Sequence, residues 1–417
     1  MKNAGRLVFV ALTVIAGCRT YEPSPIDWMR EKSVWMERGE LKFASLDDVE
    51  RIALVGNAEL NLMRVKRSLA ANVVREIGWW DDPELDVDLM RIVNPAENPA
   101  LGGASLSMTL PLSGVKGLER KAADCYLAAD AADIVAAERE TAVAVRMAAL
   151  RYLTGCESVR IQRDFESDAR VTEALAAAER LAEAGELSKT EVASARLRRH
   201  QRLHKLRESE DAVAESEQEL RRLMGVAPSV RLDFDGCADH PRPPAETVLD
   251  PLDCARHPKV RAAVCRLEGG EAALEAEIRR QYPDLRLGPA YSREEGLDRF
   301  GIVAGLTLPL WNRNRKGIAE AEGKRDEAKA EAVGIWRDIV LAADAARRTL
   351  MRLKDHPPET PPNAAVANAL VDAGEMGALE YLVLREEALE SELMERDWRR
   401  DVRLAEEYLK QFETEEK

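Results

Sequence analysis

The second half of this 417-residue chain repeats the order of the first half, and this duplication constrains the fold more than any other feature. Intervals between matching segments drift slowly from 200 to 198 and then to 189 positions. The four segments that return in the same order are 57–60 as 257–260, 83–85 as 283–285, 110–112 as 308–310, and 184–187 as 373–376. Such ordered matches indicate a tandem duplication of one structural unit.

Each half follows the same plan: a helix, two strands, a long helix, a glycine turn and a further helix. Apolar residues at helical spacing predict a helix from Ser45 to about Trp80, and Asp48, three residues after Ser45, resembles a capping box. Alternation of apolar and polar residues predicts two strands in each half. The four predicted strands cover residues 84–92, 103–110, 284–291 and 302–309.

Each predicted strand has one apolar and one polar face, as strands in a membrane barrel do. Every backbone amide in hydrocarbon must be paired, and four strands are too few to close a barrel, so several copies would share one wall. A soluble antiparallel sheet packed on a helix is the alternative. Aromatic residues at the strand ends favour the membrane, since an interfacial belt would lie there. They are Trp79, Trp80, Tyr282, Tyr291, Phe300 and Trp311.

Two long helical arms follow the strands. The alanine-rich stretch between Gly117 and Gly185 predicts an arm of 68 residues, roughly 100 Å long. Its counterpart between Gly317 and Gly374 has 57 residues, and the prolines within 355–363 should stop the helix there. Nine residues of extended polyproline chain span about 28 Å, so the shorter second arm could reach as far along the molecule as the first. The arms suit the wall of a tunnel, and a solvated coiled coil explains their alanines equally well.

The amino terminus predicts a signal peptide over residues 1–17, with basic residues before a short apolar stretch. Residues 15–18 resemble a bacterial lipobox, so we expect the mature chain to begin at lipidated Cys18. Arg19 is not the aspartate associated with retention in the inner membrane, which implies sorting to the outer membrane. An ordinary secretory signal followed by an unrelated cysteine is the alternative.

The rest of the chain divides at the duplication. We expect a lipidated tether over 18–44, a first repeat over 45–225, a proline-rich connection over 226–256 and a second repeat over 257–417. Cys237 and Cys254 could pair in an oxidising compartment, although the odd number of five cysteines after Cys18 leaves at least one thiol free.

Charge and motifs argue against several functions. A formal net charge of -14, without a basic patch of interleaved aromatics, argues against nucleic-acid binding. His200 and His204 have the spacing of paired zinc ligands, but Gln201 stands where a zinc protease has its glutamate, so we favour a solvated helix face over a metal site. Because no phosphate-binding loop or nucleophile elbow is present, the sequence predicts neither an enzyme nor a cofactor.

The order of elements resembles the TolC family of outer-membrane efflux proteins over nearly the whole mature chain. The residues that carry this resemblance are 45–50, 306–314 and the two Ala-Gly-Glu turns. It implies a mainly α fold with a small β part, in which long helical hairpins form a periplasmic α-barrel and four strands per subunit join a shared trimeric outer-membrane β-barrel. Residues 355–363 and 113–117 depart from the family pattern, the latter because they lack the Asn-Arg-Asn element.

Proteins of this family are passive export conduits of tripartite efflux or type I secretion systems. The resemblance therefore implies a homotrimer in outer-membrane lipid, with a periplasmic adaptor and an inner-membrane pump as partners. It leaves the cargo open among metal, drug and protein. Two other functions also stay open: a lipid-anchored periplasmic adaptor, which would have one helical hairpin, and a structural coiled-coil lipoprotein of the envelope, which would have no alternating strands.

Gly185 and Gly374 interrupt long helical patterns and should turn the arms back at the periplasmic tips. By resemblance, these tips dock the adaptor. The candidate docking residues are Ala184, Gly185, Glu186, Leu187, Ala373, Gly374, Glu375 and Met376.

Glu191 and Glu380 each lie six residues beyond a tip glycine and are our gate candidates. The family has an acidic gate residue at the position of Glu380, and threefold symmetry would multiply it into a ring that favours cations. The alternative is that both are solvated helix residues. Val383 replaces the second acidic residue of the family pattern, which predicts a weaker gate.

Overall fold

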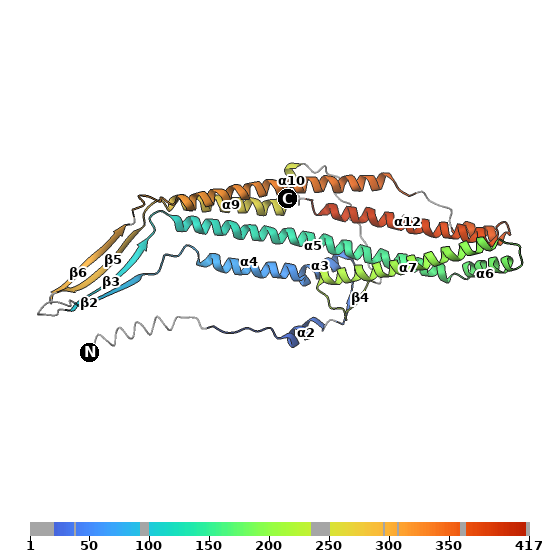
Figure 1. The fold of residues 1–417 in the computed structure, drawn as a ribbon, viewed down its shortest axis with the longest axis horizontal. Helices are drawn as coiled ribbons and strands as arrows, with labels where there is room; N and C mark the ends of the chain where they lie inside the picture. The colour runs from blue at the N-terminus through green and yellow to red at the C-terminus, as the bar shows by residue number, and fades with distance from the viewer. Residues whose placement is uncertain are drawn as a thin grey trace.

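The computed structural model is a long, narrow molecule with a sheet at one end, a body of helices that run along its length, and helical turns at the other end (Figure 1). It describes residues 21–36, 39–91, 100–234, 251–294, 297–306, 308–358 and 364–413. In these ranges, no helix is both long and apolar enough to cross a membrane.

The duplicated plan appears in both halves of the structure. The first half contains α2 (Trp28–Met36), β1 (Glu40–Lys42), α3 (Leu46–Gly56), α4 (Ala58–Glu76), β2 (Glu84–Arg91), β3 (Ala100–Leu110), α5 (Val115–Ser167), α6 (Ala169–Glu183), α7 (Lys189–Met224) and β4 (Arg231–Asp233). The second contains α8 (Pro251–Cys254), α9 (Pro258–Arg279), β5 (Leu285–Glu294), β6 (Leu297–Leu306), α10 (Arg315–Asp355), α11 (Ala364–Asp372) and α12 (Ala378–Lys410). The predicted mainly α fold with a small β part is confirmed.

The first predicted helix is divided at Asn57, whose side chain accepts hydrogen bonds from the amides of Glu59 and Leu60. Asparagine favours this capping position over a helix interior, so α3 ends and α4 begins there. The predicted capping box at Ser45 is wrong. The Ser45 side chain caps no amide, whereas the Asp48 carboxylate accepts from the amide of Ala44 at 3.1 Å.

His257 occupies the position of Asn57 in the second half and performs the same task. Its Nδ1 accepts from the amide of Lys259 at 3.2 Å at the start of α9. Burial lowers the pKa of His257 below its ordinary value of 6.5, and the backbone of Gln411 opposes that shift. Protonation of Nδ1 would remove the lone pair that caps the helix, so this cap requires neutral histidine.

A strand occurs at each of the four predicted places, and the four form one antiparallel sheet in the order β2-β3-β5-β6. The last strand covers 297–306 instead of the predicted 302–309, so residues 308 and 309 lie outside it. Leu85 pairs with Leu106 in the first hairpin, and Leu285 pairs with Leu306 in the second. Because side chains alternate along a strand, this register places most of the large apolar residues of the four strands on one face. That face carries Leu85, Val87, Leu89, Leu106, Met108, Leu110, Leu285, Leu287, Tyr291, Phe300, Ile302 and Leu306.

The opposite face of the sheet is polar and centres on Arg286. Its guanidinium donates to Ser107 at 2.8 Å and to Asp86 at 2.9 Å, and it pairs with Glu84 at 3.0 Å. Arg286 and Asp86 lie at equivalent positions of the two halves, so the duplication has placed opposite charges side by side.

The predicted 68-residue arm is likewise two helices. Asp168 separates α5 from α6, and its side chain accepts from the amide of Arg170 at 2.9 Å. An unbroken helix was the wrong expectation here, because aspartate at this position caps a new helix. In the second arm α10 ends at Asp355, and residues 359–363 of the proline segment lie outside the described residues.

The main core lies within the first half and the two segments that flank it. The short strands β1 and β4 pair in parallel, although they come from the segments 18–44 and 226–256 that flank the first repeat. Phe43 stacks on Phe234 at 4.6 Å between ring centres, with Tyr152 tilted against Phe234. These rings close one end of a cluster that contains residues of α3, α5 and α7.

Candidate functional site

The two tip glycines adopt the left-handed conformation that the sequence predicts. Gly185 has φ of 82° and Gly374 has φ of 71°. The next amide in each case bonds back into the preceding helix: Glu186 to the carbonyl of Leu181 at 2.9 Å, and Glu375 to that of Leu370 at 3.0 Å. Both arms therefore end in the same glycine-terminated helix cap.

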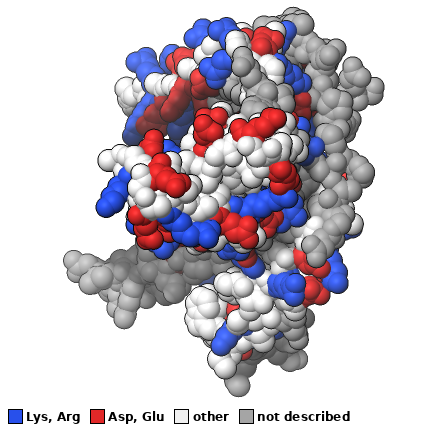
Figure 2. Space-filling view, turned by 90° about the vertical axis from the view of Figure 1, so that its right-hand side faces the viewer, with Lys and Arg blue, Asp and Glu red and all other residues white. Residues whose placement is uncertain are grey.

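Six of the eight candidate docking residues are exposed at these turns, and Leu187 and Met376 are half-buried. Leu187 packs on the small apolar cluster of Ala178, Ala182 and Val192, which holds the first turn against α6 and α7. Viewed end-on from the tips, acidic and basic side chains alternate around uncharged areas (Figure 2). The described tip surface is thus mixed in charge.

Both gate candidates cap helices. Glu191 accepts from the amide of Ser188 at 3.3 Å at the start of α7, and Glu380 accepts from the amide of Gly377 at 3.2 Å at the start of α12. Carboxylates are favoured there because helix N-termini carry partial positive charge. The sequence pattern alone did not reveal this structural role.

The structure also brings the two gate candidates together. Glu191 and Glu380 line one open groove of about 520 Å³ between the first turns of α7 and α12. Arg198 and Glu387 line it as well, so three carboxylates share the groove with one guanidinium. Among the described residues, no cluster has the arrangement of a metal site. His200 and His204 lie on exposed helix surface, where His204 is 3.4 Å from Glu208.

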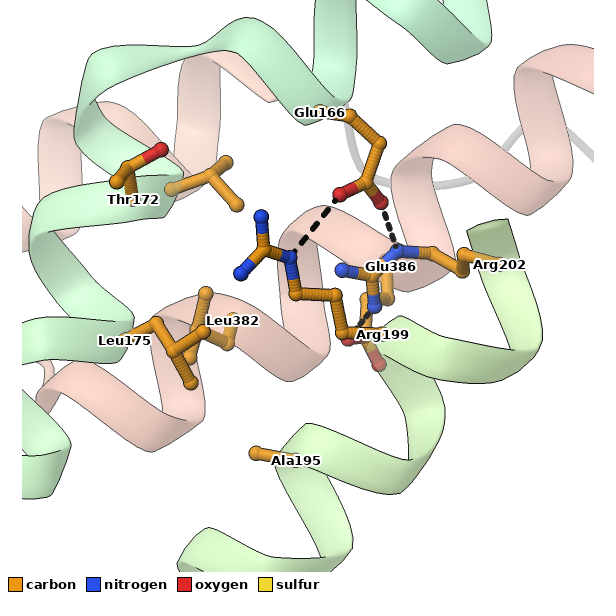
Figure 3. A pocket seen from close by; sticks show the side chains of 9 residues that line it. Glu166, Thr172, Leu175, Ala195, Arg199, Arg202, Leu382 and Glu386 are labelled. Carbon is orange, nitrogen blue, oxygen red and sulfur yellow. Dashed lines mark hydrogen bonds and ion pairs between the residues drawn. The ribbon is translucent and has the colours of Figure 1, made fainter. Parts of the chain in front are cut away.

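Behind the groove lies a half-buried ion-pair network that sequence reasoning missed. Arg202 of α7 donates to Glu166 of α5 at 2.9 Å and pairs with Glu386 of α12 (Figure 3). All three side chains are 13% exposed. Arg199 reaches Glu166 at 3.4 Å, and Arg198 reaches Glu386 at 2.9 Å. The network therefore ties the hairpin of the first half to the hairpin of the second.

Phe165 and Asp168 extend this connection. The guanidinium carbons of Arg202 and Arg385 lie 5.0 Å and 5.6 Å from the centre of the Phe165 ring. Arg385 of α12 also donates to Asp168, the residue that separates α5 from α6, at 2.8 Å. Burial raises the pKa of Glu386, and the neighbouring arginines Arg202 and Arg198 oppose that shift.

The cavity beside the network has a volume of about 10 Å³, which is room for about one water molecule and not for a substrate. This cluster therefore joins helices instead of binding cargo. Charged residues at helical spacing are common in this chain, so the sequence offered no signal that singled these out. Cys18 and Cys237 lie outside the described residues, and the lipid anchor and the Cys237–Cys254 pair stay predictions.

Comparison with solved structures identifies the fold as that of the TolC-like outer-membrane channels, which confirms the resemblance seen in the sequence. The outer-membrane channel OprN matches with a TM-score of 0.69 and 16% identity, over 95% of this chain and 97% of that one. A membrane protein from Pseudomonas aeruginosa matches with a TM-score of 0.68 and 19% identity, over 95% and 99%.

In sequence, the chain is similar to the cobalt-zinc-cadmium resistance protein CzcC of Cupriavidus metallidurans. The two are 28% identical over 217 residues, which are 49% of this chain and 51% of that protein. The match thus spans about half the length of the curated relative. No family model matches the chain.

Proposed function

We propose that this protein is a subunit of an outer-membrane export channel, a passive conduit that crosses the outer membrane and extends into the periplasm. The observation that carries the proposal is the sheet, which has a continuous apolar face and a polar face with charged residues. Leu89, Phe300 and Ile302 on the apolar face are more than 80% exposed. Such a face is stable in contact with lipid and unfavourable in water.

The sheet requires further copies of the chain. Its outer strands, β2 and β6, each lack a partner on one side within the described sheet. In hydrocarbon those free amides and carbonyls would each cost several kcal/mol, so the wall must close. A homotrimer, with twelve strands, is the assembly that the fold resemblance supports.

The helical body would then form the periplasmic tunnel. With 53 residues, α5 alone is about 80 Å long. At the end of the tunnel far from the sheet, the two glycine turns would dock a periplasmic adaptor that connects the channel to an inner-membrane pump. A lipid anchor at Cys18 would add attachment to the outer membrane. Neither an enzymatic step nor a cofactor is part of this proposal.

The two rival functions fit the fold less well. A periplasmic adaptor would have one helical hairpin, whereas this chain has two, α6–α7 and α11–α12. A coiled-coil envelope lipoprotein would not need a four-stranded sheet with an apolar face. Purified protein in mild detergent should therefore be trimeric and should conduct ions after insertion into planar lipid bilayers. A monomer that never conducts would contradict the channel.

The groove with Glu191 and Glu380 is our proposed gate, repeated three times around the tunnel axis. Each carboxylate uses one oxygen to cap its helix, which leaves the other for cations. Glu380→Gln removes the charge but keeps an oxygen that can accept from Gly377, so the helix start should survive. Single-channel conductance should rise, or cation block should weaken.

The matched control for this test is Glu375→Gln. Glu375 is an exposed acidic residue on the same turn and does not line the groove. If both variants leave the single-channel record unchanged, Glu380 is a capping residue and no gate.

For the cargo, we propose divalent transition-metal cations, because the similar protein CzcC is named for cobalt, zinc and cadmium resistance. Acidic side chains in the groove are compatible with such ions. A strain that lacks the gene should become more sensitive to these metals than to organic drugs, and the intact gene should restore tolerance. Selective sensitivity to drugs would overturn the assignment of metals.

A further inference from the structure

The apolar face of the sheet ends in a charged row at the edge farthest from the helical body (Figure 1). Arg293 of β5 pairs with Asp298 of β6 in the antiparallel register, and the next pair on this face toward the helices is Tyr291 with Phe300. Because side chains of one face recur at every second residue, the charged pair lies on the same side of the sheet as those two rings. The face that we assign to lipid therefore has a polar end.

The position of this row matches the far surface of a membrane. Arg293 lies eight residues beyond Leu285, the first residue of β5, which is about 27 Å along the strand. A strand tilt of about 40° converts this length to about 21 Å across the membrane, and the apolar band of such barrels is about 25 Å tall. The rings of Tyr291 and Phe300, with centres 5.1 Å apart, then lie at the interface, and Arg293 lies at the depth of the lipid headgroups.

Asp298 orients the arginine and leaves most of its donors available. Its Oδ1 accepts a hydrogen bond from the Tyr291 hydroxyl at 2.7 Å and lies 3.8 Å from Nε of Arg293. Among the described residues, the guanidinium of Arg293 has no hydrogen-bond partner, and the side chain is 61% exposed. Its two terminal nitrogens can therefore donate in parallel to an anion, and phosphate is an anion that fits this fork.

Two other arginines of the sheet are used within the chain. Arg286 contacts three polar side chains on the polar face, as described above. Arg299 pairs with Glu294 at 2.8 Å, also on the polar face. The side chain of Arg299 is 61% exposed, as is that of Arg293, so exposure does not explain the difference. Arg293 differs because it lies at the end of the apolar face.

Small residues lie beside Arg293 on this face. Gly102 of β3 pairs with Arg293 on one side and with Leu89 of β2 on the other, and Ala104 is the next residue of β3 on the same face. A Cβ added to Gly102 would have Leu89 as its nearest side-chain neighbour, at 3.8 Å. Neighbouring strands are about 4.8 Å apart, so the side chains of β2 and β5 leave a low strip about 10 Å wide. An acyl chain can lie along such a strip.

We propose that Arg293, oriented by Asp298, binds the phosphate of an outer-leaflet lipid, and that an acyl chain of this lipid lies on the strip formed by Gly102 and Ala104. The inference rests on the proposed channel, because that function directs this end of the sheet to the cell exterior, and it specifies a lipid that the channel binds. The guanidinium matches the charge and the geometry of the phosphate. The apolar face below it matches the hydrocarbon chain.

The test is native mass spectrometry of the full-length protein in detergent, titrated with lipid A that carries two phosphates. Arg293→Gln should weaken lipid A binding by at least about tenfold, because hydrogen bonds to charged groups are lost. Gly102→Leu should also weaken it, because leucine covers the strip. Diacylglycerol, which has no phosphate, should bind equally to the parent and to Arg293→Gln. Excess inorganic phosphate should not displace lipid A, because it lacks the acyl chains.

The matched control is Arg299→Gln, which removes an equally exposed charge from the other face of the same hairpin and should bind lipid A like the parent. Equal loss in both arginine variants, or unchanged binding in Arg293→Gln, would overturn the site. Displacement by inorganic phosphate would show a site for free anions and no lipid site. If the trimer conducts while lipid A binding is insensitive to Arg293, the inference is wrong and the proposed function stands. A monomeric, non-conducting protein would refute both.

Discussion

Arg202→Met should loosen the end of the molecule that carries the tips. The guanidinium of Arg202 connects Glu166 and Glu386, which belong to different halves of the chain, and lies against the Phe165 ring. Methionine keeps most of the apolar side chain and removes the charge. Each of the two half-buried carboxylates then keeps one arginine. Arg199 lies 3.4 Å from Glu166, and Arg198 lies 2.9 Å from Glu386.

Breaking a buried ion pair costs about 3–5 kcal/mol when the remaining charge has no partner. Since each carboxylate keeps one arginine, we expect a loss at the lower end of this range. The free energy of local opening of the hairpins should fall by about 3 kcal/mol. That corresponds to amide exchange faster by about two orders of magnitude. Hydrogen–deuterium exchange of the amides in α6 and the first turns of α12 measures it directly.

Arg222→Met is the matched control on the same helix. Arg222 pairs with Glu219 at 2.7 Å, but their side chains are 64% and 45% exposed, and such surface pairs contribute about 0–1 kcal/mol. Exchange in α6 and α12 should therefore stay close to that of the parent protein. If Arg202→Met accelerates exchange no more than Arg222→Met does, the network is not what holds the two hairpins together.

Three further predictions concern other parts of the chain. Folding lowers the pKa of His257 below its ordinary value of 6.5. His257 therefore stabilises the folded protein fully when the pH is above 6.5, and this stabilisation declines as the pH falls below that value. His257→Asn should keep the α9 cap without this pH dependence, and His257→Ala should cost about 1 kcal/mol, as measured by thermal unfolding between pH 5 and 8. Leu306→Arg should destabilise the folded channel in lipid by about 2–4 kcal/mol if it lies at the bilayer midplane, whereas Val303→Arg on the polar face should cost less; equal costs in refolding titrations would contradict the assignment of faces. Mass spectrometry should find an acylated amino terminus at Cys18, and Cys18→Ala should abolish acylation; an intact signal peptide or a cut elsewhere would argue against the anchor.

The sequence determined the elements whose cause is local or periodic. Alternation predicted four strands and their apolar face, because the period of a strand is set by backbone geometry. Gly185 and Gly374 were recognisable since a left-handed turn at a helix end favours glycine. The duplication predicted that both halves share one plan, and the equivalent caps Asn57 and His257 show that plan at the level of single side chains.

The tertiary structure decided which distant groups meet. Glu166, Arg202 and Glu386 are ordinary charged helix residues in the sequence, and they form a network because α5, α7 and α12 converge behind the tips. Glu191 and Glu380 looked like isolated gate candidates, but folding places them in one groove and gives each a capping role. A linear pattern fixes which face of a helix a side chain occupies, whereas its partner depends on how helices far apart in the chain pack together.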